Sequence, residues 1–149
     1  MMEDLKPKAL VLVAAAVGVI SPPVAAQTSE SGNFAQGRAL YQTHCASCHG
    51  KNLEGQSDWQ IRLPNGRLPA PPHDRTGHTW HHPDEHLFRI TKFGIVPPLA
   101  PEGYESDMPA FGDVLSDDEI WSALNFIKST WPERFQRRQQ DVTRRAKKQ

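Results

Sequence analysis

The sequence has little of several things that mark common classes of protein. Its two cysteines in 149 residues allow at most one disulfide or one redox dithiol. Its longest apolar run, residues 9–20, is too short to span a bilayer comfortably as a helix. It contains no clear strand pattern and no internal repeat, and its formal net charge is zero. A chain of this length has room for one modest domain with extensions.

The apolar run belongs to a leader-like segment at the N-terminus. Lys6 and Lys8 precede it, and small residues ending at Ala26 follow it, as in a secretory signal with its cleavage site. We predict a cleaved signal peptide over residues 1–26, with a retained anchor as the alternative. The mature protein would begin at Gln27 and be periplasmic or otherwise exported, so nucleic acid is not an expected partner.

The zero net charge hides an asymmetry along the chain. Residues 27–132 contain eight Lys or Arg and thirteen Asp or Glu, whereas residues 133–149 contain seven Lys or Arg and two acids. The second segment is predicted to be a basic C-terminal tail, either solvated or a frayed helix. Its alternative role is docking to an acidic partner or an anionic membrane surface, which added salt would weaken.

Both cysteines lie in one motif, Cys45-Ala46-Ser47-Cys48-His49, which is the C-x-x-C-H pattern of haem c attachment. The two thiols add to the vinyl groups of the porphyrin, and the adjacent imidazole binds the iron from one face. In bacteria this attachment takes place outside the cytoplasmic membrane, in agreement with the predicted export. The alternative is a thiol–disulfide oxidoreductase, but its motif normally starts a helix in a βαβ unit, whereas this one ends a predicted helix with no strand nearby.

An iron that passes electrons without binding substrate needs a second axial ligand. Met108 is the candidate, because it lies in a Pro-rich loop before a capped helix and is the only methionine after the leader. Ligation by His49 and Met108 predicts a higher reduction potential than ligation by two histidines, since a neutral thioether favours ferrous iron. An open sixth position, or a histidine in place of Met108, would instead indicate a haem enzyme or a gas- or metal-binding sensor.

Three main helices are predicted after a disordered lead over residues 27–32. The first begins with Asn33 as its N-cap and runs into the C-x-x-C-H motif. Gly37 inside this helix costs about 1 kcal/mol relative to alanine, so we expect it to permit a close approach by another helix. The second helix covers residues 84–93, with Gly94 at its C-terminal end.

The third helix carries the strongest signal. Ser116 and Glu119 form a capping box in front of an apolar stripe that ends at Trp131. The connections are long and rich in proline, in particular residues 63–72 and 95–109. Loops of this length argue against an assignment in most compact domains, but they are expected where a large apolar disc supplies part of the core.

Five of the seven histidines lie in one stretch of the sequence. We interpret this stretch as a polar loop over the haem edge, with side chains that pack or hydrogen-bond near the haem propionates. The alternatives are a copper or zinc site built from histidines spaced for one helical face, and a distal haem histidine. The histidines are His73, His78, His81, His82 and His86. Candidate N–H donors to the propionates are Trp59, Arg75 and Trp80.

In combination, these motifs resemble the class I (small, monohaem) bacterial cytochromes c over roughly residues 34–132. The resemblance implies an all-α cytochrome c fold, in which three main helices and long Pro-rich loops wrap around one covalently attached haem c. The cytochrome domain would cover residues 33–132. The matching pieces are Gly37-x-x-x-Tyr41, the C-x-x-C-H motif with Gly50, Met108-Pro109 and the helix over residues 116–131.

The resemblance also implies two specific contacts. The first and last helices would cross, with Gly37 against an aromatic residue of the last helix, Phe126. A carbonyl of the Pro-rich loop, that of Pro71 or Pro72, would accept a hydrogen bond from His49 Nδ1. Such a bond would fix the imidazole and tune its donor strength.

The sequence therefore predicts an exported monohaem c-type cytochrome that carries single electrons and is not an enzyme, as a separate shuttle or as the cytochrome subunit of an oxidoreductase. Cys45 and Cys48 would tether haem c, and His49 and Met108 would ligate its iron. The expected partners are a redox protein donor and acceptor, with transient docking to a membrane complex, and the expected state is a monomer. The alternative is a haem enzyme or a gas- or metal-binding sensor whose sixth position is open or held by histidine.

Overall fold

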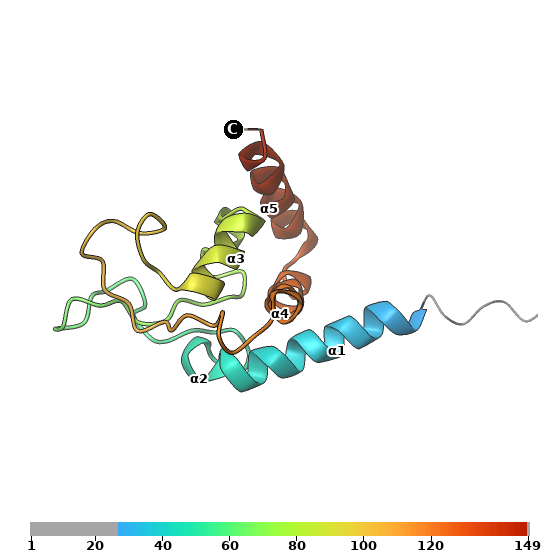
Figure 1. The fold of residues 1–149 in the computed structure, drawn as a ribbon, viewed down its shortest axis with the longest axis horizontal. Coiled ribbons are helices and arrows are strands. Elements are labelled where there is room, and N and C mark those ends of the chain that lie inside the picture. The colour runs from blue at the N-terminus through green and yellow to red at the C-terminus, as the bar shows by residue number, and fades with distance from the viewer. Residues whose placement is uncertain (1–26, 149) are drawn as a thin grey trace, which may run out of the picture.

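The computed structural model describes residues 27–148, with side chains described from residue 33. The predicted signal peptide, residues 1–26, lies outside the described residues. Within them the fold is all-α and contains no strand, as the sequence predicts (Figure 1). The described helices are α1 (Gln27–His44), α2 (Ala46–His49), the 3₁₀ helix η2 (Thr79–His81), α3 (Asp84–Phe93), α4 (Asp117–Ser129) and α5 (Glu133–Ala146). None of the helices described has both the length and the apolar composition to cross a membrane.

The first helix begins earlier than the sequence predicts. It starts at Gln27, so residues 27–32, expected to be a disordered lead, are helical, and Asn33 is not the N-cap. Once the C-terminal half of α1 is packed, each further residue adds a backbone hydrogen bond without a new nucleation cost. Extension towards the N-terminus therefore overrides the local capping signal at Asn33.

Helices α1 and α4 cross closely, as the resemblance implies, and Figure 1 views α4 nearly end-on while α1 runs across the picture. Gly37 lies at the contact, where a Cβ atom would overlap the carbonyl oxygen of Ser122 and stand 3.0 Å from the Cβ of Phe126. Tyr41, one turn further along α1, is fully buried, with its ring centroid 5.6 Å from that of Phe126. The predicted contact between Gly37 and Phe126 is therefore confirmed, and only glycine allows this crossing distance.

The capping box at the start of α4 is also confirmed. The Ser116 hydroxyl accepts a hydrogen bond from the Glu119 backbone N–H, and the Glu119 carboxylate accepts one from the Ser116 backbone N–H. The carboxylate also accepts a hydrogen bond from the Ser116 hydroxyl, and the two bonds that it accepts favour its ionised form and lower the pKa of Glu119. The apolar stripe behind the cap fills the core together with Tyr41, and its buried members are Leu115, Ile120, Leu124, Ile127 and Trp131.

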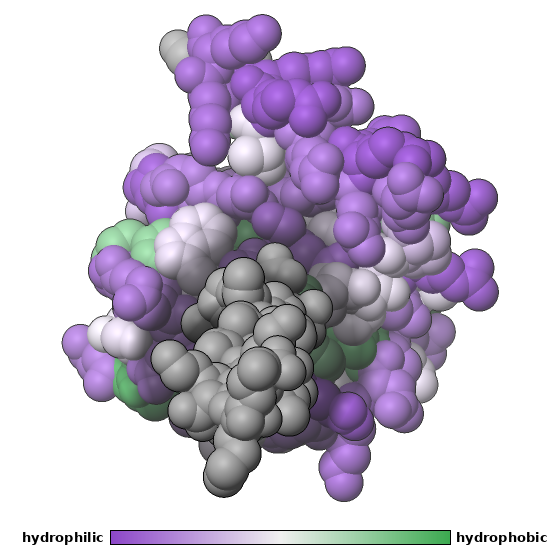
Figure 2. All heavy atoms as spheres, turned by 90° about the vertical axis from the view of Figure 1, so that its right-hand side faces the viewer, coloured by the Kyte–Doolittle hydropathy of each residue, from purple (hydrophilic) through white to green (hydrophobic). Residues whose placement is uncertain are grey.

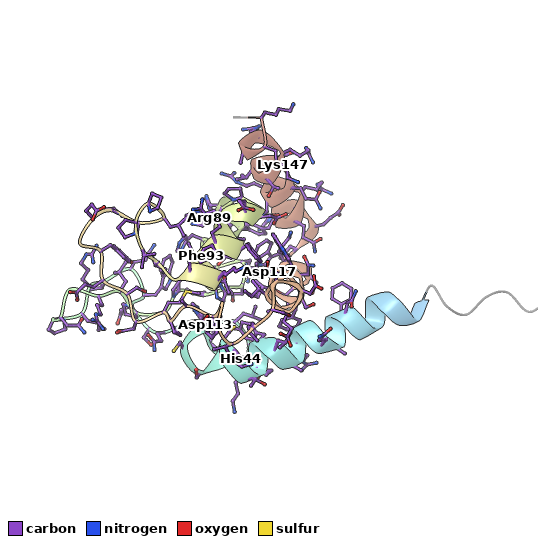
Figure 3. All side chains as sticks on the ribbon, in the orientation of Figure 1. His44, Arg89, Phe93, Asp113, Asp117 and Lys147 are labelled. Carbon is purple, nitrogen blue, oxygen red and sulfur yellow. The ribbon has the colours of Figure 1, made fainter. Side chains whose placement is uncertain are left out.

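Helix α3 has the bounds that the sequence predicts, and it packs on α4. The rings of Phe88 and Trp121 stack with centroids 4.8 Å apart. Lys92 Nζ near the end of α3 donates to Asp117 Oδ1 at 2.6 Å, and Asp117 is labelled at the start of α4 in Figure 3. Gly94 follows α3 with a φ of 83°, a positive value that glycine adopts without the steric cost of a Cβ atom, and the helix ends there.

The predicted basic tail is in fact a fourth long helix, α5, that packs back on the domain. Trp80 of η2 meets Phe135 of α5 at a centroid distance of 4.6 Å. Gln139 is 1% exposed, and its side-chain amide donates to Asp84 Oδ1 at 2.7 Å and to Thr143 Oγ1 at 3.1 Å. The sequence analysis missed this docking because the buried face of α5 is formed largely by polar residues. Figure 2 shows α5 as a strongly hydrophilic projection at the top of the molecule.

Candidate functional site

The C-x-x-C-H motif forms the short helix α2, which follows α1 after a break at Cys45. The Cys45 side chain is half-buried and that of Cys48 is exposed, and no disulfide joins them. Burial, together with the neighbouring Cys48, raises the pKa of the Cys45 thiol to about 11. Redox-active C-x-x-C pairs instead contain a thiol whose pKa is lowered, so these surroundings disfavour the thiol–disulfide oxidoreductase alternative.

His49 is buried and held in one orientation. Its Nδ1 lies 2.8 Å from the carbonyl oxygen of Pro71. Because a carbonyl only accepts, Nδ1 must carry the proton and donate, so the neutral ring has its lone pair at Nε2. Burial lowers the pKa of His49 and keeps it neutral. The contact expected with Pro71 or Pro72 is therefore confirmed at Pro71.

The backbone after His49 is fixed as well. The hydroxyl of the buried Tyr41 donates to the carbonyl oxygen of Gly50 at 2.8 Å and lies 3.3 Å from that of His49. Among the described residues His49 Nε2 has no hydrogen-bond partner. A neutral imidazole with its outer nitrogen unpaired, four residues after a half-buried thiol and next to an exposed one, fits the ligand set of haem c.

His73 is the residue that the sequence analysis underestimated. Its ring stacks on that of His49 with centroids 4.0 Å apart, and its Nδ1 lies 2.9 Å from Thr79 Oγ1. The Trp131 indole N–H donates to the His73 carbonyl at 2.7 Å. Burial of the ring, together with the neighbouring histidines, lowers the pKa of His73 well below its usual value, so the ring packs as a neutral group. Its position two residues after Pro71 was the signal that could have placed it beside the ligand.

The rest of the histidine-rich stretch forms a line of ring contacts. The His78 and His82 centroids are 5.3 Å apart, and those of His82 and His86 are 4.8 Å apart. Burial and the neighbouring histidines lower the pKa of His82 to about 4. Over the part of the chain with described side chains, no three His, Cys, Asp or Glu residues are grouped so that they could hold a metal. The structure therefore gives no support to the copper or zinc alternative.

The candidate propionate donors differ in their surroundings. Arg75 is exposed, and Trp59 stacks on His78 with centroids 5.2 Å apart. Trp80 Nε1 and His78 Nδ1 are buried and have no hydrogen-bond partner in the described part of the structure. Buried polar atoms are normally paired, so these two are the atoms of this region best suited to meet a further polar group.

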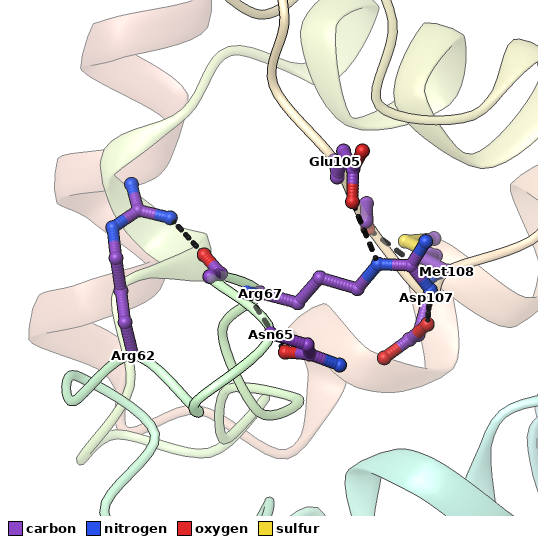
Figure 4. Close-up of polar contacts among 8 residues, drawn as sticks. Arg62, Asn65, Arg67, Glu105, Asp107 and Met108 are labelled. Carbon is purple, nitrogen blue, oxygen red and sulfur yellow. Dashed lines mark hydrogen bonds and ion pairs between the residues drawn. The ribbon is translucent and has the colours of Figure 1, made fainter.

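Met108 lies in the long loop between α3 and α4 and is partly buried. Its backbone N–H donates to Ser106 Oγ at 3.1 Å. Figure 4 shows Met108 beside the ion pairs of Arg67 with Glu105 and Asp107. Met108, Arg67 and Glu105 also line one pocket of about 390 Å³. The assignment of Met108 as the second axial ligand stays a prediction.

A further pocket, of about 710 Å³, lies between α1 and α4, and Phe34, Trp121 and Asn125 are among its lining residues. None of the four predicted haem-binding residues lines it. Most of its lining residues are polar, and none belongs to the C-x-x-C-H motif. We therefore do not assign the functional site there.

Comparison with known protein families gives a match over most of the predicted cytochrome domain. Residues 32–127 match the family described as cytochrome c oxidase, cbb3-type, subunit III. The matched segment is more than half of the chain and contains the C-x-x-C-H motif, the Pro-rich loops, Met108 and most of α4. It ends before α5. No curated protein and no solved structure matches the chain.

Proposed function

The chain belongs to the family described as cytochrome c oxidase, cbb3-type, subunit III, and on that premise we propose that it is an exported carrier of single electrons whose one haem c is ligated by His49 and Met108. The family supports a c-type cytochrome that transfers electrons. The observation that carries the finer proposal is the neutral His49 imidazole, with Nδ1 bonded to the Pro71 carbonyl and Nε2 unpaired among the described residues.

Each residue of the motif has a distinct role in this proposal. Cys45 and Cys48 tether the group covalently, so that it stays with the chain in both redox states. When bound, haem c supplies an iron that accepts and releases one electron. His49 donates its Nε2 lone pair, and the bond to Pro71 both fixes the ring and increases its basicity. Tyr41 holds the backbone that carries the ring.

Met108 supplies the second ligand. A neutral thioether favours ferrous iron, and burial of the site acts in the same direction because it penalises the extra charge of the ferric state. With His49 and Met108 both holding the iron, no position would be open to a substrate. The protein would then act as an electron carrier, in contrast to the haem enzyme or gas sensor of the alternative reading.

The partners and the location follow from the same proposal. The leader-like residues 1–26 support export, and the family supports redox partners that include a membrane complex. Haem c attachment outside the cytoplasmic membrane agrees with that location. We propose that the protein acts as a monomer, which sedimentation of the purified holoprotein would test.

A visible spectrum tests the ligand pair directly. We expect low-spin haem in both redox states, a far-red thioether-to-iron charge-transfer band in the ferric protein, and haem that stays with the polypeptide through denaturation. Met108→Ala should abolish that band and allow carbon monoxide to bind the ferrous protein at neutral pH. High-spin ferric haem in the wild type, or carbon monoxide binding to it, would favour the open-site alternative.

A further inference from the structure

The loop that contains Met108 has few connections to the rest of the molecule. Among the described residues, every backbone–backbone hydrogen bond made by residues 95–110 stays within residues 94–110. The first backbone bonds to another element come after Met108, where the N–H groups of Phe111 and Gly112 donate to the carbonyls of Thr91 and Lys92 at 3.0 and 2.9 Å. The backbone alone therefore anchors only the C-terminal end of this loop.

Arg67 supplies the missing connection. It belongs to the other Pro-rich loop, and its guanidinium forms ion pairs with Glu105 and Asp107, the second of which directly precedes Met108 (Figure 4). The Nε to Glu105 Oε2 distance is 3.3 Å. No other ion pair in the described part of the chain reaches residues 95–110, and Arg62 adds only a cation–π contact, 5.9 Å from the centroid of the Tyr104 ring.

The turn that presents Arg67 is well defined. The Arg67 backbone N–H donates to Asn65 Oδ1 at 3.1 Å, and its carbonyl accepts from the Leu63 N–H at 2.9 Å. Arg62 Nη1 donates to the Gly66 carbonyl across the same turn at 2.5 Å. The arginine therefore projects from a locally hydrogen-bonded turn towards a loop that has no backbone bond to it.

We propose that Arg67 is the positioning residue for Met108, and that its two exposed ion pairs make the hold on this ligand dependent on ionic strength. This inference rests on the proposed ligation by Met108. The side chains of Arg67, Glu105 and Asp107 are 36%, 66% and 59% exposed, so ions in solution screen the pairs. Loss of the pairs releases the N-terminal part of the loop while the backbone bonds of Phe111 and Gly112 remain.

Competition by imidazole measures how firmly Met108 is held. The ferric holoprotein is titrated with imidazole at about pH 8, where most of the probe is neutral, and loss of the far-red band is followed. Arg67→Gln should bind imidazole about fivefold more tightly than the wild type, as expected from the loss of two exposed pairs. The matched control is Arg137→Gln, which removes the exposed pair with Glu133 on α5 and should leave the imidazole affinity unchanged.

Ionic strength separates an electrostatic role from a packing role. Between about 0.01 M and about 1 M salt, the wild-type affinity for imidazole should rise towards that of Arg67→Gln, whereas the affinity of the variant should change little. Arg67→Lys, which keeps the charge, should restore most of the wild-type behaviour. In a background of Glu105→Gln and Asp107→Asn, Arg67→Gln should have no further effect, since its partners are already neutral.

The outcomes distinguish this inference from the function on which it rests. A wild-type protein without the far-red band overturns the proposed Met108 ligation. A wild type that shows the band, with Arg67→Gln equal to it in imidazole affinity at low salt, overturns the role of Arg67 and leaves the ligation intact. An increase in affinity that is the same at both salt concentrations also overturns it, because packing alone would then explain the effect.

Discussion

His49 and Met108, the two proposed iron ligands, lie in surroundings of opposite kind. His49 is 7% exposed, its ring stacks on His73, and its Nδ1 is bonded to the Pro71 carbonyl. Met108 is partly buried in a loop whose ion pairs to the rest of the described structure are the exposed ones of Arg67 with Glu105 and Asp107. One ligand is held by the core and the other by a surface contact.

This difference separates the stability of the whole domain from the firmness with which Met108 is held. Contacts on the His49 side are buried and cooperative, so their loss should lower the free energy of unfolding of the whole domain. Contacts on the Met108 side are solvated, so their loss should change how the ligand is held with little effect on global stability. The following substitutions test that separation, from the largest expected effect to the smallest.

The apolar core on the His49 side should be the most sensitive region. Ile120 is 0% exposed and packs in the same cluster as Tyr41 and Ala46, so Ile120→Ala should lower the free energy of unfolding by about 3 kcal/mol. Val114, which follows the Met108 loop and is 60% exposed, is the control, and Val114→Ala should change it by less than about 0.5 kcal/mol. Guanidinium unfolding measures both, and equal effects would contradict the comparison.

The hydroxyl groups of Tyr41, near His49, and of Tyr104, in the Met108 loop, allow a comparison of smaller effects on stability. Tyr41→Phe removes the donor to the Gly50 carbonyl and should lower the free energy of unfolding by about 1 kcal/mol, because that carbonyl loses a partner. Tyr104→Phe removes a hydroxyl that has no hydrogen bond in the described part of the structure, so its effect should be near zero. The same unfolding experiment measures both, and a loss with Tyr104→Phe as large as that with Tyr41→Phe would refute the contrast.

The contacting rings of His78, His82 and His86 should make the stability of the folded protein sensitive to acid. His82 has a folded pKa of about 4, below the ordinary value of 6.5, so between these pH values the unfolded chain binds more protons than the folded one. Stability should therefore fall as the pH is lowered from about 6.5 to about 4. His82→Gln should reduce the slope of unfolding free energy against pH in this window, though burial also lowers the pKa of His73, His78 and His86 and will keep part of it. A slope equal to that of the wild type would show that His82 does not contribute.

Apart from the control substitutions, Arg67→Gln should change the stability least, although it should weaken the hold on Met108. Arg67→Gln removes two exposed ion pairs and should lower the free energy of unfolding by less than about 1 kcal/mol. Chemical unfolding of the same holoprotein samples used for the imidazole titration measures this. A loss comparable to that of Ile120→Ala would mean that the loop and the core unfold together, and the two sides would not be separable.

Features that depend on short stretches of sequence could be predicted well. The capping box of Ser116 and Glu119 involves residues three apart, and the bounds of α3 follow from Pro83 and Gly94 on either side of it. The close contact at Gly37 was also predictable, because a glycine inside a helix has few other uses. For the capping box and for α3, the chemistry that fixes the structure lies within a few residues along the chain. For Gly37 the sequence indicated only that a helix approaches closely, and its partner Phe126 followed from the family resemblance.

Features that depend on distant or polar partners were missed. The buried face of α5 is built on Gln139 and Thr143, and no apolar periodicity marks such a face. The stacking of His73 on His49 and the pairing of Arg67 with Asp107 join residues far apart in the sequence. The residue types alone did not distinguish these side chains from solvated ones, because their roles depend on which segments the fold brings together.

The crossing of α1 and α4 also sets an order in time. The C-x-x-C-H motif directly follows α1, whereas Ser122 and Phe126, which meet Gly37, come near the end of the matched segment. Because a chain is synthesised from its N-terminus, Cys45 and Cys48 emerge well before the helix that closes the domain over α1. The motif therefore precedes, in the order of synthesis, the contact at Gly37 that completes the packing around α1. We expect a chain truncated before α4 to retain the motif but to lack the part of the core formed by Ile120, Leu124 and Ile127.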